Sequence, residues 1–251
     1  MRYFRFVSKR KQKLETNPYG PGLRRLFLNL ILIGMLLING LISQDLYHWF
    51  PAPYLTFFLC SLLSMVCLLG DYILVKLSGI QENGNILRAV TDSTTHASVG
   101  ALVWAVAEGY EFLGEKKKWL NVLFCAFLAA SVDLDHFMAA GSLDLKKALH
   151  LQHRPPFHIT SLIPAVVFLC WIIGYYRPSM KVFSLMFLAS WLSHHLRDAN
   201  HRGLWLAPFG HTPVFPSVVY IFLIVVLSLI VRICYCHLQT NTVHTSIFQI
   251  V

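Results

Sequence analysis

The stretch that decides the fold runs from residue 54 to residue 74 and reads YLTFFLCSLLSMVCLLGDYIL. It carries a single charged side chain, Asp71. A helix needs about 20 mostly apolar residues to cross the hydrocarbon core of a bilayer. This stretch is long enough and apolar enough, and it therefore predicts a transmembrane helix.

Further apolar runs lie on both sides of this stretch. The other expected helices are Leu26–Ser43, Thr95–Val106, Leu120–Met138, Ile159–Tyr176, Val182–Leu196 and Val214–Ile233. The runs at 95–106 and 182–196 are short, so the count is six or seven. Charged residues make up 13% of the chain, against roughly 25% in a soluble domain. The expected fold class is all-α, a polytopic integral membrane bundle with six or seven transmembrane helices.

The distribution of positive charge predicts how the bundle is oriented. The net charge is +9, and eight of the 21 basic residues fall within the first 25 positions. With alternating spans, 15 basic residues lie on the side of the N-terminus and 6 on the other. Basic loops favour the cytoplasm, so we expect a cytoplasmic N-terminus. The basic residues form no patch interleaved with aromatic residues, which argues against nucleic acid as a partner and favours membrane lipids.

Charged side chains are costly at membrane depth and therefore mark candidate functional sites. In this chain histidines and aspartates gather at the ends of four apolar runs. The groups are His96; Asp133, Asp135 and His136; His153, Arg154 and His158; and His194, His195 and Asp198. In an up-and-down bundle the starts of odd-numbered helices and the ends of even-numbered ones share one side. All four groups are therefore expected at the same membrane face.

The spacing within these groups is typical of ligands on a helix face. His194 and Asp198 are four residues apart, and Asp133 and His136 are three apart, so each pair shares a face. Mixed histidine and aspartate ligands suit zinc, manganese, iron or magnesium. No cysteine lies in the groups, which argues against a structural zinc site. Asp92, followed by Ser93 and Thr94, is expected to cap the start of a helix.

The order of these motifs resembles a known family. The patterns are T-H-x-x-x-G at His96, D-x-D-H at 133–136, H-R-x-x-x-H at 153–158 and H-x-x-x-D at 194–198. They resemble the bacterial membrane-bound metal-dependent hydrolases, whose histidines and aspartates are taken to bind metal. The longer stretches DSTTH, ASVDLDHF, SHHLRD and GLWLAPFG are more similar still to the eukaryotic family called transmembrane protein 267. The resemblance covers roughly residues 87–220.

The motifs and the resemblance together define the candidate site and the regions of the chain. The expected metal ligands are His96, Asp133, Asp135, His158, His194 and Asp198. The candidate catalytic residues are Asp133, His136, His153 and Arg154, with the two histidines as ligand or general acid and the arginine as a clamp for phosphate or carboxylate. The expected regions are a basic cytoplasmic arm at 1–25, two transmembrane helices within 26–86, a hydrolase-like core at 87–220 and the end of the last helix with a tail at 221–251.

Three functions remain open at this stage. The first is a metal-dependent hydrolase of a lipid or another phosphoester, in which a divalent ion activates water at the membrane face. The second is a non-catalytic scaffold or pseudoenzyme that keeps an ancestral site. The third, a transporter or proton relay, predicts polar residues through the whole depth of the bilayer, whereas here they stay near one face.

Overall fold

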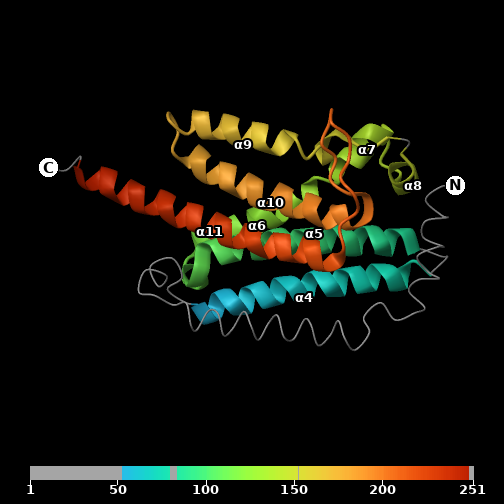
Figure 1. Ribbon diagram of the computed structural model, residues 1–251, viewed down its shortest axis with the longest axis horizontal. Coiled ribbons are helices and arrows are strands. Elements are labelled where there is room, and N and C mark those ends of the chain that lie inside the picture. The colour runs from blue at the N-terminus through green and yellow to red at the C-terminus, as the bar shows by residue number, and fades with distance from the viewer. Residues whose placement is uncertain (1–52, 80–83, 152, 249–251) are drawn as a thin grey trace. The chain divides into compact units, whose positions relative to one another are not determined.

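A computed structural model describes residues 53–79, 84–151 and 153–248, with side chains as far as residue 240. The described residues belong to one compact unit, Trp49–Val251. Its longer helices are α4 (Pro53–Leu77), α5 (Gly84–Glu108), α6 (Lys116–Ser131), α9 (Leu162–Ile173), α10 (Ser179–Arg202) and α11 (Ser217–Phe248) (Figure 1). Two short helices, α7 (Leu134–Ala140) and α8 (Leu145–Leu149), and two 3₁₀ turns, η1 (Gly109–Leu113) and η2 (Pro156–His158), complete the unit. The predicted all-α membrane bundle is confirmed. The basic arm at 1–25 and the expected helix Leu26–Ser43 lie outside the described residues.

Three helical stretches of the described chain are long and apolar enough to cross a membrane. They are Pro53–Leu77, Lys116–Ala140 and Ser217–Thr240, while Leu162–Ile173 is apolar but shorter. The runs expected at 95–106 and 182–196 lie inside α5 and α10, which extend to 25 and 24 residues. An apolar pattern underestimates these two helices because each continues through polar residues, at 84–94 in α5 and at 197–202 in α10.

The core lies around α5, which packs against α4, α6, α10 and α11. Val99, Val103 and Trp104 on α5 are fully buried, as are Leu63 on α4 and Ile224 on α11. Small residues let the helices approach closely. A Cβ atom at Gly100 of α5 would lie 2.5 Å from the Cβ of Ala129 on α6, so only glycine fits this crossing.

The chain direction alternates, and this brings distant segments to one end of the bundle. α5, α9 and α11 begin, and α4 and α10 end, on the side where α7 and α8 lie (Figure 1). The loop after α10 stays at this end, where the Thr160 amide donates to the Trp205 carbonyl at 2.8 Å. Gly203 starts this loop with φ +70, and a Cβ there would lie 2.1 Å from the Thr212 carbonyl oxygen. Three of the four polar groups found in the sequence lie at this end. His96, expected at the start of a helix at Thr95, lies halfway along α5, because this helix begins at Gly84.

Candidate metal centre

The side chains of the candidate centre come from four separate elements. His96 lies in the middle of α5, and His194 and Asp198 lie one turn apart near the end of α10. Asp133 occupies the turn between α6 and α7, where the helix is interrupted for two residues. Pro155 and Pro156 cannot continue a helix and instead open the 3₁₀ turn η2, which carries His158 into the bundle.

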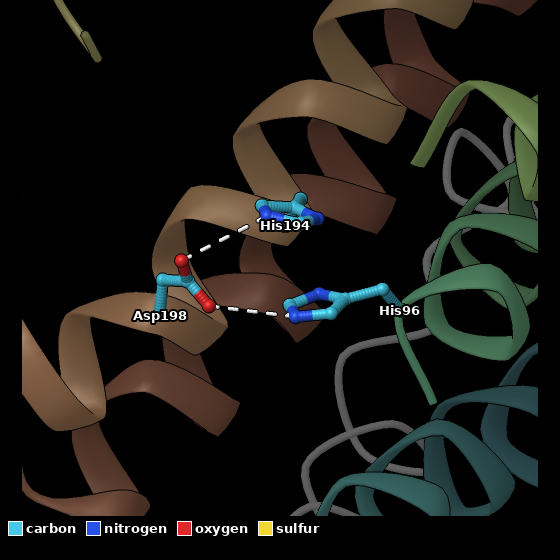
Figure 2. Close-up of side chains that lie close together, drawn as sticks. All are labelled: His96, His194 and Asp198. Atoms are coloured by element: carbon cyan, nitrogen blue, oxygen red, sulfur yellow. Dashed lines mark ion pairs between the residues drawn. The ribbon is translucent and has the colours of Figure 1, made fainter. Parts of the chain in front are cut away.

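The Asp198 carboxylate lies at the middle of three imidazole rings. Its Oδ1 atom is 3.4 Å from Nε2 of His96, and its Oδ2 atom is 3.4 Å from Nε2 of His158 and 3.8 Å from Nε2 of His194. Figure 2 shows the two oxygens directed at His194 and His96, whose rings stack with their centroids 3.7 Å apart. One carboxylate therefore joins α10 to both α5 and η2.

Asp133 approaches two of the same rings with one oxygen. Its Oδ1 atom lies 3.5 Å from Nε2 of His158, 3.7 Å from Nε2 of His194 and 3.9 Å from Nδ1 of His136. Two groups of three have donor atoms close enough to share an ion. They are His96, His194 and Asp198, and Asp133, His136 and His158. The contacts of Asp198 with His158 and of Asp133 with His194 connect the two groups into one cluster.

Two of the rings are held in place by a contact at Nδ1, the nitrogen that faces away from the cluster. Histidine ligands in protein metal sites are commonly held in this way. Nδ1 of His194 lies 2.9 Å from the carbonyl oxygen of Ala129, which can only accept, so the proton is on Nδ1 and the lone pair of Nε2 faces the cluster. Nδ1 of His158 lies 3.3 Å from Oδ2 of Asp135. A carbonyl or carboxylate behind an imidazole sets its tautomer and makes it a better ligand.

Asp135, expected as a ligand, is placed behind His158. It is almost fully buried, and its Oδ2 atom also accepts the Phe157 amide at 2.7 Å. Its Oδ1 atom is 3.1 Å from Nδ1 of His136, although the two are not aligned for a hydrogen bond. The carboxylate thus positions η2 and the His158 ring. Its contacts suit a residue that supports a ligand.

The cluster fits a divalent ion by its geometry and its donor types. Two donors bound at about 2.1 Å to a tetrahedral ion are about 3.4 Å apart, and the contacts among Asp133, Asp198 and the rings span 3.4 to 3.8 Å. Nε2 of His194 is buried and has no hydrogen-bond partner. An unsatisfied buried nitrogen is costly unless something binds it. Nitrogen and oxygen donors without sulfur suit zinc, manganese, iron or magnesium.

The carboxylates of the cluster favour the protonated form of His158. Burial alone would lower the pKa of this imidazole, but the carboxylates of Asp133, Asp135 and Asp198 raise it to about 11. The ring therefore holds a proton at neutral pH when no other cation is present. The same three carboxylates attract a doubly charged metal ion more strongly than the single charge of the proton. They therefore favour binding of a divalent cation in place of that proton.

A second set of polar side chains adjoins His96 and was not recognised as a unit from the sequence. Arg197 is almost fully buried, and its guanidinium donates to Oδ1 of Asp92, to Oδ1 of Asp71 at 3.5 Å and to Nε2 of His96 at 2.9 Å. Asp71 also accepts Asn200 at 3.1 Å and the Tyr220 hydroxyl at 2.6 Å. This arginine network ties α4, α5, α10 and α11 together beside the cluster.

The expected capping role of Asp92 is wrong. The helix begins at Gly84, so Asp92 lies two turns inside α5, and its carboxylate accepts from Arg197. The motif D-S-T-T resembles a cap because it precedes an apolar run. The helix continues through it because the polar side chains find partners or the preceding backbone carbonyls, as Thr94 and Thr95 do with Val90 and Thr91.

Three further residues of the motifs lie around the cluster. Nη1 of Arg154 donates to the Gly203 carbonyl at 3.0 Å, while its Nε has no partner. Burial lowers the pKa of Arg154, and the negative charge of the Asp198 carboxylate raises it in part. The guanidinium is therefore close enough to the cluster to be attracted by this carboxylate. His153 is exposed and lines a neighbouring cleft. His195 faces away, with Nδ1 3.0 Å from the Thr160 hydroxyl and Nε2 2.9 Å from the Phe157 carbonyl.

Comparison with known proteins identifies the family of this chain. Residues 91–251 match the family model described as YdjM inner membrane protein. Transmembrane protein 267 of Xenopus laevis is 35% identical over 188 residues, which cover 73% of this chain and 85% of that protein. The proteins of the same name from Mus musculus and Danio rerio are 40% and 41% identical, covering 63% and 60% of this chain and 73% and 67% of theirs. No solved structure matches the chain. The chain therefore belongs to the YdjM inner membrane protein family and to the family of transmembrane protein 267.

Proposed function

We propose that this membrane protein is a metal-dependent hydrolase whose centre, formed by Asp133, His158, His194 and Asp198, acts on a phosphoester at one membrane face. His96, expected as a ligand, is left out of this set because the lone pair of its Nε2 atom accepts a hydrogen bond from Arg197 at 2.9 Å. The observation that carries the proposal is the orphaned Nε2 atom of His194. It is fully buried, it is held in place through Nδ1 by the Ala129 carbonyl, and it faces two carboxylates at 3.7 and 3.8 Å. These distances are too long for hydrogen bonds but suit donors that share an ion.

A divalent ion held by these residues would polarise the phosphoryl oxygen and lower the pKa of a bound water towards neutrality. The chain's own residues supply the other requirements. Asp133, His136 and Asp198 are partly exposed, with side chains 32%, 22% and 22% accessible, so the cluster is open to a substrate on this side. His158 and His194, in contrast, are buried and hold fixed positions.

Two residues are suited to roles beside the ion. Arg154 has guanidinium donors that its single bond to Gly203 does not use, and it lies within the field of Asp198, so we assign it to hold an anionic oxygen of the substrate. His136 is partly exposed, its Nδ1 lies 3.1 Å from Asp135, and its ring meets that of His158 at a centroid distance of 4.8 Å. It is the group we assign to carry a proton to the leaving oxygen.

The first experiment measures the metal content of the full chain purified in detergent. Wild type is expected to hold a divalent metal, and His194→Ala is expected to lose it because the variant lacks the orphaned donor. His211→Ala is the matched control, since His211 is exposed and lies outside the cluster. Both variants should elute as folded protein, because the bundle is held together by helix packing. His194→Ala is expected to melt below wild type, since it loses the stabilisation that bound metal gives to the folded state.

The second experiment measures turnover of bis-p-nitrophenyl phosphate and of phosphatidylcholine in mixed micelles. Activity that requires the metal and disappears in His194→Ala would support the hydrolase. A metal-loaded wild type without turnover of either compound would favour the scaffold. A well-folded wild type that binds no divalent metal would refute the proposed centre.

A further inference from the structure

The segment between the α6–α7 turn and η2 exposes apolar side chains near the candidate centre. Leu134 and Met138 on α7 are 53% and 71% exposed, and Leu143 in the turn before α8 is 90% exposed. The turn itself is well defined, with Gly141 at φ +57 and the Asp144 side chain accepting the Lys146 amide at 2.9 Å. Exposed leucines and methionines on an ordered segment of a membrane protein indicate contact with the lipid interface.

The same segment forms one wall of an open cleft with a basic lining. The cleft has a volume of about 680 Å³, and its apolar part is formed by Ala139, Ala140, Leu151, Pro155 and Pro156. Its charged and ionisable lining residues are Lys146, Lys147, His150, His153 and Arg154. No carboxylate lines it, and within the described part of the chain Lys146, Lys147 and Arg154 form no ion pair. Three fixed positive charges thus converge on one apolar cleft.

The combination of charge and apolar surface identifies the occupant. An inorganic anion needs the cations but gains nothing from the alanines, prolines and exposed leucines. A nucleic acid would stack its bases on aromatic side chains, and no phenylalanine, tyrosine or tryptophan lines the cleft. An anionic phospholipid uses both parts, because its phosphate pairs with lysine and arginine while its acyl chains lie against apolar surface. α7 also continues the apolar stretch Lys116–Ala140, so the cleft lies where that span ends.

We propose that the cleft between α7, α8 and η2 binds the phosphate headgroup of an anionic phospholipid, with Lys146 and Lys147 as its main charge partners. This binding does not depend on a metal or on turnover. Arg154 belongs to both the cleft and the surroundings of Asp198. A lipid held in the cleft therefore lies beside the candidate centre.

The test is native mass spectrometry of the full chain in detergent with added phosphatidic acid. Lys146→Gln/Lys147→Gln should weaken binding of this lipid about 30-fold, since each basic residue near an anionic lipid contributes a factor of about five. Lys116→Gln/Lys117→Gln is the matched control. These two exposed lysines at the start of α6 lie at the other end of the stretch Lys116–Ala140, and their removal should leave binding unchanged.

Two further arms separate the possible ligands. Phosphatidylcholine should bind far more weakly than phosphatidic acid, and millimolar inorganic phosphate should displace little of the lipid. Equal binding of phosphatidic acid by wild type and the cleft variant would overturn the proposal. Binding of inorganic phosphate without binding of the lipid would also overturn it. Metal content is measured in the same samples, so a failure of the candidate centre is recognised separately.

Discussion

Replacing Arg197 with methionine should destabilise the bundle strongly, because it removes the cation from a buried network. The guanidinium is 2% exposed and contacts Asp71, Asp92 and His96. Methionine keeps much of the volume, so the change tests the charge and not the packing. The two carboxylates would then lie close to each other and to the candidate centre without the cation that now separates them.

The expected magnitude follows from the exposure of each carboxylate. Breaking a buried ion pair by removing one partner costs about 3–5 kcal/mol. Asp92 is 43% exposed and regains solvent, whereas Asp71 is 8% exposed but keeps its bonds to Asn200 and Tyr220. Both facts place the loss at the lower end, about 3 kcal/mol. For a chain of this size that corresponds to a melting temperature lower by about 6–12 °C.

The assay is thermal unfolding of detergent-purified protein, followed by intrinsic fluorescence. Arg177→Met serves as the control, because Arg177 is exposed and its loss should change stability by less than about 0.5 kcal/mol. Arg197→Met combined with Asp71→Asn should recover part of the loss, since it removes the buried charge that was left unpaired. If Arg197→Met had the melting temperature of wild type, the ion pairs of this network would not stabilise the packing of the four helices.

The remaining predictions concern the metal. Asp135→Ala should weaken metal binding about 10–100-fold without abolishing it, because Asp135 accepts from the far side of the His158 ring and does not bind the metal itself. Competition with a chelator measures the metal affinity of Asp135→Ala and of His194→Ala. An equal loss in the two variants would make Asp135 a ligand. Metal affinity should rise about tenfold per pH unit between pH 6.5 and 8.5, since the pKa of His158 is raised to about 11 and its proton must leave when the ion binds. That proton stabilises the metal-free fold fully below the unfolded pKa of about 6.5, and this contribution disappears as the pH rises through about 11. If metal affinity did not change with pH, metal binding would not displace a proton from His158.

The convergence of the four polar groups was predictable because it depends only on the order of the helices. Successive spans run in opposite directions, so polar residues at alternate ends meet. The exception is His96, which lies halfway along α5 because that helix begins at Gly84 and not at Thr95. The spacing of four between His194 and Asp198 also indicated which of two adjacent histidines turns inward. Neighbouring residues on a helix point about 100° apart, and His195 accordingly faces Thr160 and Phe157.

The supporting residues were not predictable, because their roles depend on the rotation of one helix against another. Asp133 and Asp135 stand in the same motif, yet one faces the cluster and the other lies behind His158. Their assignment depends on the break between α6 and α7, which an apolar run from 120 to 138 does not reveal. Arg197 is similar. Asp71 stands near the end of the stretch 54–74 and could be expected on the side of the site, but the sequence does not say that it pairs with Arg197, 126 positions away.

Two buried polar clusters in the same bundle show what distinguishes a structural network from a binding site. Glu108, at the opposite end of α5 from Gly84, accepts Trp104 Nε1 at 3.0 Å and Asn121 Nδ2 at 2.9 Å on one oxygen, and the Tyr235 hydroxyl at 3.0 Å on the other. Every acceptor there has a donor, so the network is closed and stabilises the junction of α5, α6 and α11. Around Asp198 the balance is different, because three carboxylates share the protonated ring of His158 and Nε2 of His194 has no donor at all. An excess of acceptors over donors attracts a cation, and this chemical imbalance supports a metal at one cluster and a structural role for the other.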